Sequence, residues 1–98
     1  MNKIEKDKIL YKPFKSPLKG KKYAVYVKRD DRKVLIHFGD SSMQHFKDKL
    51  GEWSNLDHND KARRKNFLTR TAGIKNKKGE FTAFNKNYAN YWARRILW

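Results

Sequence analysis

Two short stretches of alternating apolar residues constrain the fold of this chain more than any other feature. They lie in KYAVYVK and KVLIHFG and are separated by a break at Asp30 and Asp31. Because successive strand side chains point to opposite faces, each stretch has one apolar face and the pair predicts a β-hairpin. The apolar positions are Tyr23, Val25, Val27, Val34, Ile36 and Phe38. The turn at 29–32 lacks the glycine that favours a two-residue type I′ turn, so we expect a longer loop or a small uncertainty in register.

A first helix is expected directly after the hairpin. Gly39 and Asp40 end the second strand, Asp40 or Ser41 can cap the helix, and Gly51 can close it. Its apolar stripe would consist of Met43, Phe46 and Leu50. This helix is expected to pack on the hairpin.

Two further helices are predicted in the second half of the chain. Capping side chains at 57–60 precede a helix over 61–72 that ends before Gly73, and Arg64 falls among its apolar residues. A last helix starts at about Tyr88, and its core stripe is Tyr88, Ala89, Trp92, Ala93 and Ile96. The expected fold class is α+β, with a two- or three-stranded antiparallel sheet packed against about three helices.

The chain divides into a basic N-terminal arm over 1–22 and a single α+β domain over 23–98, because 98 residues are too few for more than one domain. Residues 12–22 hold five lysines, both prolines, a glycine and no acid. Proline disfavours pairing inside a sheet, so the arm should follow a surface in an extended form. A solvated disordered tail is the alternative.

The charge of the chain points to a polyanionic partner. Lys and Arg number 25 and Asp and Glu number 10, which gives +15. Such a charge repels itself in a compact state unless an anion relieves it, while 14% aromatic residues indicate a folded body rather than a disordered tail. The absence of cysteine excludes disulfides and thiolate metal sites. No apolar run resembles a secretory signal or a membrane span, and we expect no membrane partner.

Residues 61–79 form the densest basic segment and contain no acid. Lysine and arginine there can neutralise phosphates and release counterions, which is the main source of sequence-independent affinity for nucleic acid. A solvated helix face and loop is the alternative interpretation. The candidate phosphate contacts in this segment and in the arm are Lys19, Lys21, Lys22, Lys61, Arg63, Arg64, Lys65, Arg70, Lys75, Lys77 and Lys78.

Tyr91, Arg94 and Trp98 fall together on the last helix, opposite its core stripe, with Arg95 at the edge. Flat rings beside guanidinium groups are typical of a stacking platform for unpaired bases. The same residue types also anchor protein interfaces. As a further alternative, Trp98 folds back into its own core.

The histidines and aspartates offer a weaker constellation. His37, His45 and His58 with Asp40, Asp57 and Asp60 have the ligand types of a metal-dependent nuclease. Capping explains the residues at 57–60 without a metal, and no nucleophile with a paired base, phosphate loop or dinucleotide motif is present. We therefore expect no catalytic residue, no metal and no cofactor.

Four segments carry a resemblance: KKYAVYVKR, VLIHFGDSSMQHFKDKLG, LDHNDKARRKNFLTRTAGIKNKKGEF and NKNYANYWARRILW. Together they resemble a family of short uncharacterised basic proteins encoded by large DNA viruses and tailed phages. The likeness covers about 21–98. The matching positions are His37, Gly39, Asp40, His58, Asp60, Arg63, Asn90, Trp92 and Trp98. The resemblance implies a viral origin, and no activity comes with it.

These observations predict a virus- or phage-encoded, non-enzymatic protein that binds nucleic acid, with DNA expected ahead of RNA, through its phosphate backbone. The alternative is a structural protein of the virion, such as a minor capsid or connector component in contact with capsid proteins. A metal-dependent nuclease is the less favoured third hypothesis. The expected location is the host cytoplasm or nucleus, or the virion.

Overall fold

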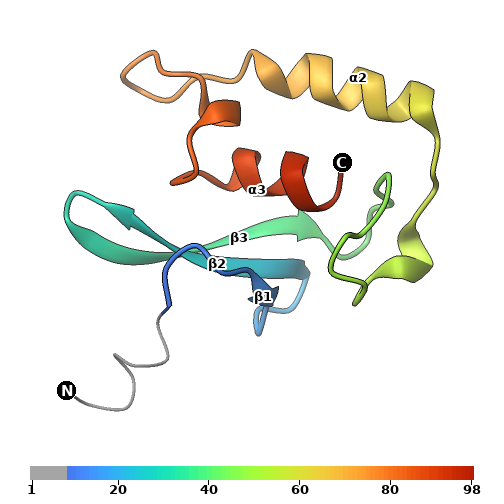
Figure 1. Ribbon diagram of the computed structural model, residues 1–98, viewed down its shortest axis with the longest axis horizontal. Helices are drawn as coiled ribbons and strands as arrows, with labels where there is room; N and C mark the ends of the chain where they lie inside the picture. Colours follow the sequence, from blue (N-terminus) through green and yellow to red (C-terminus); the bar gives the residue numbers. More distant parts are fainter. Residues whose placement is uncertain (1–8) are drawn as a thin grey trace.

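The core of the molecule is an antiparallel sheet of three strands in the order β1-β2-β3 (Figure 1). The computed structural model describes residues 9–98. The strands are β1 (Phe14–Lys15), β2 (Lys21–Arg29) and β3 (Arg32–Asp40). Tyr23 pairs with Phe38 and Val25 with Ile36, so the two apolar faces lie together as the alternation predicts. The predicted hairpin is confirmed.

The hairpin turn is shorter than expected. Arg29 pairs with Arg32, and only Asp30 and Asp31 connect the strands. Both aspartates have left-handed backbone, with φ of 50° and 62°. Positive φ at both central residues is the requirement of a type I′ turn, and aspartate is one of the few residues other than glycine that tolerates it. The expectation of a longer loop was wrong for this reason.

The described part of the N-terminal arm joins the sheet. Phe14 and Lys15 pair with Ala24 and Tyr23 at the sheet edge, between the two prolines of the arm. The Phe14 ring stacks on Tyr26, with 5.8 Å between the ring centroids. Edge positions are where proline is compatible with strand pairing. Strand β2 begins at Lys21, so the last two arm residues belong to the sheet, and residues 1–8 lie outside the described part.

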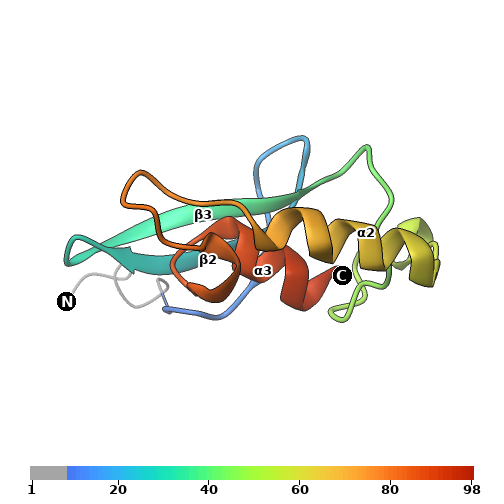
Figure 2. The same ribbon diagram turned by 90° about the horizontal axis from the view of Figure 1, so that it is seen from above.

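Two helices cover one face of the sheet in successive layers (Figures 1 and 2). Helix α3 (Ala89–Ile96) lies on the strands, and α2 (Lys61–Ala72) lies beyond α3 on the same side. Trp92 and Ile96 of α3 and the following Leu97 pack with the apolar face of the hairpin, which includes Val25 and Phe38. The 3₁₀ helices η1 (Ser54–Leu56) and η2 (Thr82–Phe84) lie in the connections.

The predicted boundaries of these two helices are confirmed. The Asp60 carboxylate accepts hydrogen bonds from the backbone N–H of Ala62 and Arg63, and Gly73 follows the last residue of α2. Helix α3 begins after Tyr88. Neither helix, nor any other in the described residues, has the length and apolar character needed to cross a membrane.

The helix expected after the hairpin is absent, so the sheet is covered by two helices instead of three. The segment 41–51 forms turns and loop, and two of its predicted apolar residues, Met43 and Leu50, are 61% and 45% exposed. Its N–H groups donate to other parts of the chain: His45 to the carbonyl of Leu56, Lys47 to that of Leu97 and Lys49 to that of Ile96. These long-range bonds replace the local bonds of a helix.

Gly39 allows the end of the hairpin to approach the end of α3. Its φ is 80°, and a Cβ atom at this position would lie 2.7 Å from Leu97 Cδ1 and 3.1 Å from Lys22 Cβ. Real Cβ atoms do not approach side chains this closely, and the left-handed conformation alone costs an alanine roughly 1–2 kcal/mol. Both the left-handed backbone and the lack of space for a Cβ atom therefore favour glycine at this position.

We predict that Gly39→Ala lowers the free energy of unfolding by at least about 1 kcal/mol more than Gly20→Ala does. Gly20 is the matched control, because its φ is 92° and a Cβ atom added there would have nothing within 4 Å. Urea unfolding of both variants measures the difference. Equal losses would show that the contact with Leu97 carries no cost.

Candidate nucleic-acid interface

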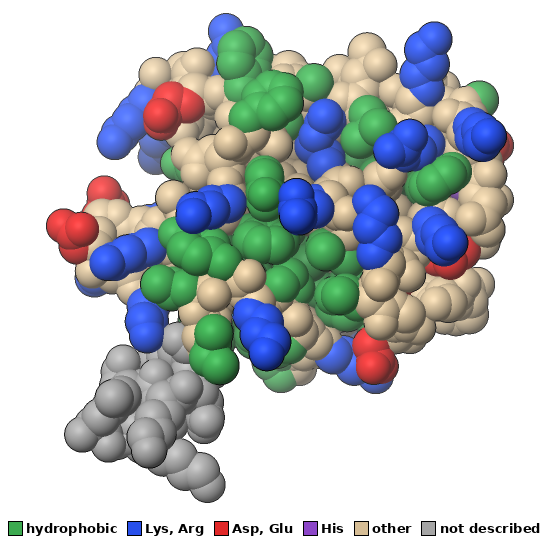
Figure 3. Space-filling view, in the orientation of Figure 1, with side chains coloured by type: hydrophobic (Ala, Val, Ile, Leu, Met, Phe, Trp, Pro, Cys, Tyr) green, Lys and Arg blue, Asp and Glu red, His purple; other side chains and the backbone are tan. Residues whose placement is uncertain are grey.

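The basic residues of 61–79 lie on the outer layer of the molecule. Lys61, Lys65, Lys77 and Lys78 are exposed, and their side chains make no hydrogen bond or ion pair with residues 9–98. Figure 3, which looks across the layers in the orientation of Figure 1, shows lysine and arginine side chains spread over and around a central apolar area, with acidic side chains mostly towards the edges. Folding therefore leaves much of the predicted basic segment accessible to an anion.

The turn that carries the loop lysines is well defined. Asn76 Oδ1 accepts hydrogen bonds from the N–H groups of Lys78 and Glu80, and the Asn76 N–H donates to the Glu80 carbonyl. Lys75 pairs with Phe81 across this turn in a single antiparallel bridge. Side-chain hydrogen bonds of this kind fix turns, so Lys75, Lys77 and Lys78 are presented from a definite backbone.

Two of the predicted phosphate-binding or stacking arginines donate hydrogen bonds to backbone carbonyls of the chain, although Arg64 remains exposed. Arg64 Nε donates to the Trp98 carbonyl at 2.6 Å, and its guanidinium lies over the Phe46 ring. Arg94 Nη1 donates to the Leu68 carbonyl at 2.6 Å and to Thr71 Oγ1 at 2.7 Å. These arginines connect α2 to its neighbours and have fewer donors left for a ligand.

The predicted lysines of the arm have different environments. Lys19 is exposed in the turn between β1 and β2, and Lys21 is exposed at the start of β2. Lys22 is 1% exposed. Lys22 is therefore buried, unlike the exposed lysines Lys19 and Lys21 beside it in the sequence.

The aromatic residues at the C-terminal end of the chain are packed rather than presented. The ring of Trp98 stacks on Phe67 at 4.1 Å with 8° between the planes, and His58 lies against it at 5.2 Å. Tyr91 makes an edge contact with Trp92 at 5.0 Å. Trp98 therefore folds back, as one of the alternatives proposed, whereas Tyr91 is half-buried and the Arg95 guanidinium lies 6.0 Å from its ring centroid. Arg95, at their edge, is exposed.

Two exposed phenylalanines that sequence reasoning missed lie beside the lysine turn. Phe81 is 47% exposed and Phe84 is 73% exposed. Lys75 Nζ lies 5.0 Å from the Phe81 centroid, and the Arg94 guanidinium lies 6.0 Å from that of Phe84. The one available signal was their position directly after KNKKGE, since apolar periodicity assigns such rings to a core.

A buried chain of hydrogen bonds runs from Lys22 through His45 to Asp57. Lys22 Nζ donates to the Met43 carbonyl at 2.7 Å and to His45 Nδ1 at 2.8 Å. Because an ammonium can only donate, Nδ1 accepts and Nε2 carries the proton that is donated to Asp57 Oδ1 at 2.5 Å. His45 is fully buried, and its imidazole is neutral in this arrangement.

Burial and the Lys22 charge lower the pKa of His45, and together they outweigh the opposing effect of Asp57. Burial also lowers the pKa of Lys22 and, with the charge of Arg63, the pKa of His58. His58 Nδ1 accepts the Asp60 N–H, while the buried Nε2 finds no partner in residues 9–98. A second buried pair lies nearby, where the Tyr23 hydroxyl donates to Asp48 Oδ2 at 2.5 Å.

Among the side chains of the nuclease hypothesis, His45 and Asp57 hydrogen-bond to each other, and the others have different hydrogen-bond partners. His37 Nδ1 lies 2.7 Å from Ser16 Oγ, and Asp40 Oδ1 accepts from Ser42. In residues 9–98, no group of three or more histidine, aspartate or glutamate side chains is arranged to hold a metal ion. Asp60 caps α2, which is the role the sequence assigned to this region.

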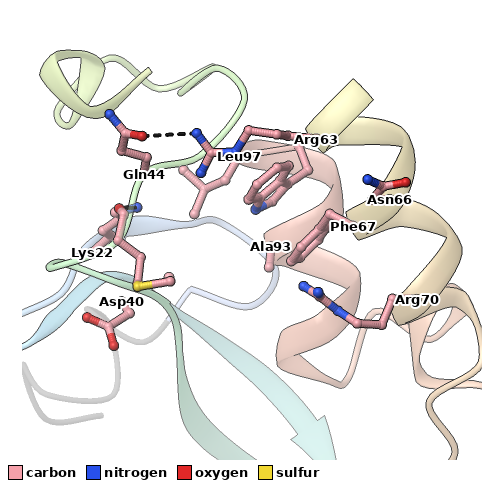
Figure 4. A pocket seen from close by; sticks show the side chains of 12 residues that line it. Lys22, Asp40, Gln44, Arg63, Asn66, Phe67, Arg70, Ala93 and Leu97 are labelled. Atoms are coloured by element: carbon pink, nitrogen blue, oxygen red, sulfur yellow. Dashed lines mark hydrogen bonds between the residues drawn. The ribbon is translucent and has the colours of Figure 1, made fainter. Parts of the chain in front are cut away.

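A cleft of about 510 Å³ lies between α2, the end of α3 and the turn after β3 (Figure 4). Its apolar lining comes from Met43, Phe67, Ala93, Leu97 and Trp98. Its polar lining comes from Lys22, Asp40, Gln44, Arg63, Asn66 and Arg70. Arg63 Nη1 donates to Gln44 Oε1 at 3.0 Å across the opening. The cleft therefore brings predicted phosphate-binding residues of α2 beside an apolar surface.

No family model, no curated protein and no solved structure matches this chain. The resemblance to virus-encoded proteins stays a prediction.

The lowered pKa values of His45 and His58 predict that acid destabilises the fold. In the unfolded chain both imidazoles bind protons as the pH falls through about 6.5, while the folded state resists protonation until lower pH. The unfolded state then holds more protons, so the free energy of unfolding falls from pH 7 to pH 5. Urea unfolding at several pH values, with an NMR titration of the histidine rings, measures this. A free energy that is constant or rises on acidification would contradict it.

Proposed function

We propose that this protein is a non-enzymatic nucleic-acid-binding module that contacts the phosphate backbone through α2 and the turn at 75–78. The observation that carries the proposal is a group of exposed lysines without partners in residues 9–98: Lys61, Lys65, Lys77 and Lys78. Unpaired lysines have no internal ion pair to break, and counterions are released when they meet phosphates.

The charge of the whole chain supports the same partner. At +15 the protein attracts polyanions over distances beyond direct contact. Contacts with backbone phosphates carry no sequence information in themselves, so binding is expected to be largely independent of sequence. DNA is expected ahead of RNA, on the strength of the viral resemblance alone.

Phe81 and Phe84 add a second element to the proposal. Exposed aromatic rings beside cations are the components with which proteins stack unpaired bases. Helix η2, which contains Phe84, contacts α2. A strand that follows the lysines of the turn would pass these rings, and we expect single-stranded nucleic acid to bind more tightly than duplex.

A structural role in a virus particle is the second candidate. It is favoured by the same exposed apolar residues, because Phe81, Phe84 and the 47% exposed Ile74 also suit a protein interface. This role predicts a fixed copy number in purified particles, whereas absence from the particle would eliminate it.

We predict that the triple change Lys65→Glu, Lys77→Glu and Lys78→Glu weakens DNA binding on all sequences alike. Each lost phosphate contact should reduce the slope of log affinity against log salt by about 0.9 on duplex and about 0.7 on a single strand. Fluorescence anisotropy over a series of salt concentrations would measure both quantities.

The matched control is Lys12→Glu, Lys28→Glu and Arg32→Glu, which changes the net charge equally at exposed positions of the N-terminal segment and the hairpin. The control should keep the salt slope of the original protein. If both triple variants lose the same affinity and slope, net charge alone drives binding and the proposed surface is wrong.

Replacing both Phe81 and Phe84 by alanine should weaken single-strand binding by about 1–3 kcal/mol for each stacked base and leave duplex binding nearly unchanged. The control is Leu18→Ala with Leu50→Ala, two apolar residues that are 50% and 45% exposed elsewhere. Anisotropy with a pyrimidine oligonucleotide and with its duplex measures the difference. An equal loss on both substrates would argue against stacking.

A further inference from the structure

We propose that the cleft between α2, α3 and the turn after β3 is a nucleotide-binding site, with the base on its apolar lining and the phosphate on α2. The proposal stands on the lining of the cleft and holds whether or not the exposed lysines bind a strand. The nucleotide is either a free mononucleotide or an unpaired residue of a strand, since both present the same chemistry.

Space for a flat ring lies beside Ala93 of α3, which presents only a methyl group to the cleft. Met43 and Leu97 supply apolar surface beside this opening. A volume of about 510 Å³ lies within the range of roughly 300–1,000 Å³ that is typical of small-molecule sites.

One amide side chain is free to read the edge of a ring. Asn66 lines the cleft from α2, and its side chain makes no hydrogen bond with residues 9–98. Gln44 lines the cleft from the opposite side, and its Oε1 accepts from Arg63. A carboxamide offers a donor and an acceptor together, which is the pattern that bases also present.

The charge of the lining selects an anion. Arg63 and Arg70 are exposed cations of the lining, which holds a single acid. The Lys22 ammonium also borders the cleft but is buried and already donates to the Met43 carbonyl and His45. That acid, Asp40, has one carboxylate oxygen that already accepts two hydrogen bonds from Ser42. A neutral or cationic ligand would leave this excess of positive charge uncompensated.

Arg70 is the phosphate contact that the geometry favours. Its guanidinium lies 5.7 Å from the Phe67 centroid and makes no hydrogen bond with residues 9–98. Arg63 lies two helical turns earlier on the same face of α2. Guanidinium groups bind phosphate oxygens through two parallel hydrogen bonds. Asn66 lies between these arginines, so base and phosphate contacts alternate along one helix face.

The test is a titration of the isotope-labelled protein with the four ribonucleoside 5′-monophosphates, followed by two-dimensional NMR. Signals of the Asn66 and Gln44 amides and of the Ala93 methyl group should shift with saturation, while signals of the hairpin tip should not. Adenosine and inorganic phosphate are tested as fragments of the nucleotide, and each should bind at least tenfold more weakly than adenosine 5′-monophosphate. Equal binding of inorganic phosphate would overturn the proposal, because the base would then contribute nothing.

Arg70→Gln should weaken mononucleotide binding roughly tenfold, since a charge-assisted bidentate contact is lost. Lys28→Gln is the matched control, with the same loss of charge at an exposed hairpin position, and should bind as the original protein does. Ala93→Leu fills the cleft and should abolish binding, and Asn66→Ala supplies an exposed alternative if that variant misfolds. Equal losses in Arg70→Gln and Lys28→Gln would overturn the site.

Competition distinguishes the two sources of the nucleotide. If a saturating mononucleotide displaces a single-stranded oligonucleotide, or the oligonucleotide shifts the same cleft signals, the strand supplies the base. If both bind together, the cleft takes a free nucleotide. Failure of the lysine triple variant to weaken DNA binding would remove the proposed backbone surface and leave this site standing.

Discussion

The long connection between the hairpin and α2 depends on one buried chain of hydrogen bonds, from Lys22 through His45 to Asp57. A buried ammonium is costly unless it is compensated, and here the Met43 carbonyl and the His45 ring compensate it. Asp57 Oδ1 also accepts the Asp48 N–H, so the same carboxylate fixes the loop backbone. The same hydrogen bonds fix the position of Met43 and Gln44, which form one side of the cleft.

The fold divides the positive charge into two classes. Arg64 and Arg94 donate to carbonyl groups that join α2 to the end of the chain and to α3, and Lys22 is buried. Several lysines of α2 and the following turn, together with Arg70, keep no hydrogen-bond or ion-pair partner in residues 9–98. Net charge counts both classes equally, but only the second is free to meet a phosphate. The proposed backbone surface and the proposed nucleotide site therefore use different subsets of one basic segment.

Several positions of the viral resemblance have a structural role in the described chain. Gly39 permits the contact with Leu97, Asp60 caps α2, and the indole N–H of Trp92 donates to the Lys86 carbonyl. Asn90 Nδ2 donates to the Thr71 carbonyl and to Thr82 Oγ1, which ties α3 to α2 and η2. Residues of this kind specify the fold, and the resemblance itself stays a prediction.

The sequence by itself determined the elements whose signals are local. The alternation around Tyr23 and Phe38 specified the hairpin, and the Asp60 cap, Gly73 and the stripe containing Trp92 specified α2 and α3. The sequence also identified 61–79 as the basic segment, because a run of lysines and arginines without an acid is visible without any tertiary contact.

Only the tertiary structure decided the segment 41–51 and the fate of the aromatic rings. The helical spacing of Met43, Phe46 and Leu50 was overridden because the N–H groups of this segment bond to carbonyls distant in sequence, such as that of Leu97. The Trp98 ring is packed on Phe67, whereas the Phe84 ring is exposed to solvent. Both environments depend on how the helices pack together, which the local sequence does not encode. The cleft also forms from separate segments, and no local pattern encodes contacts of that range.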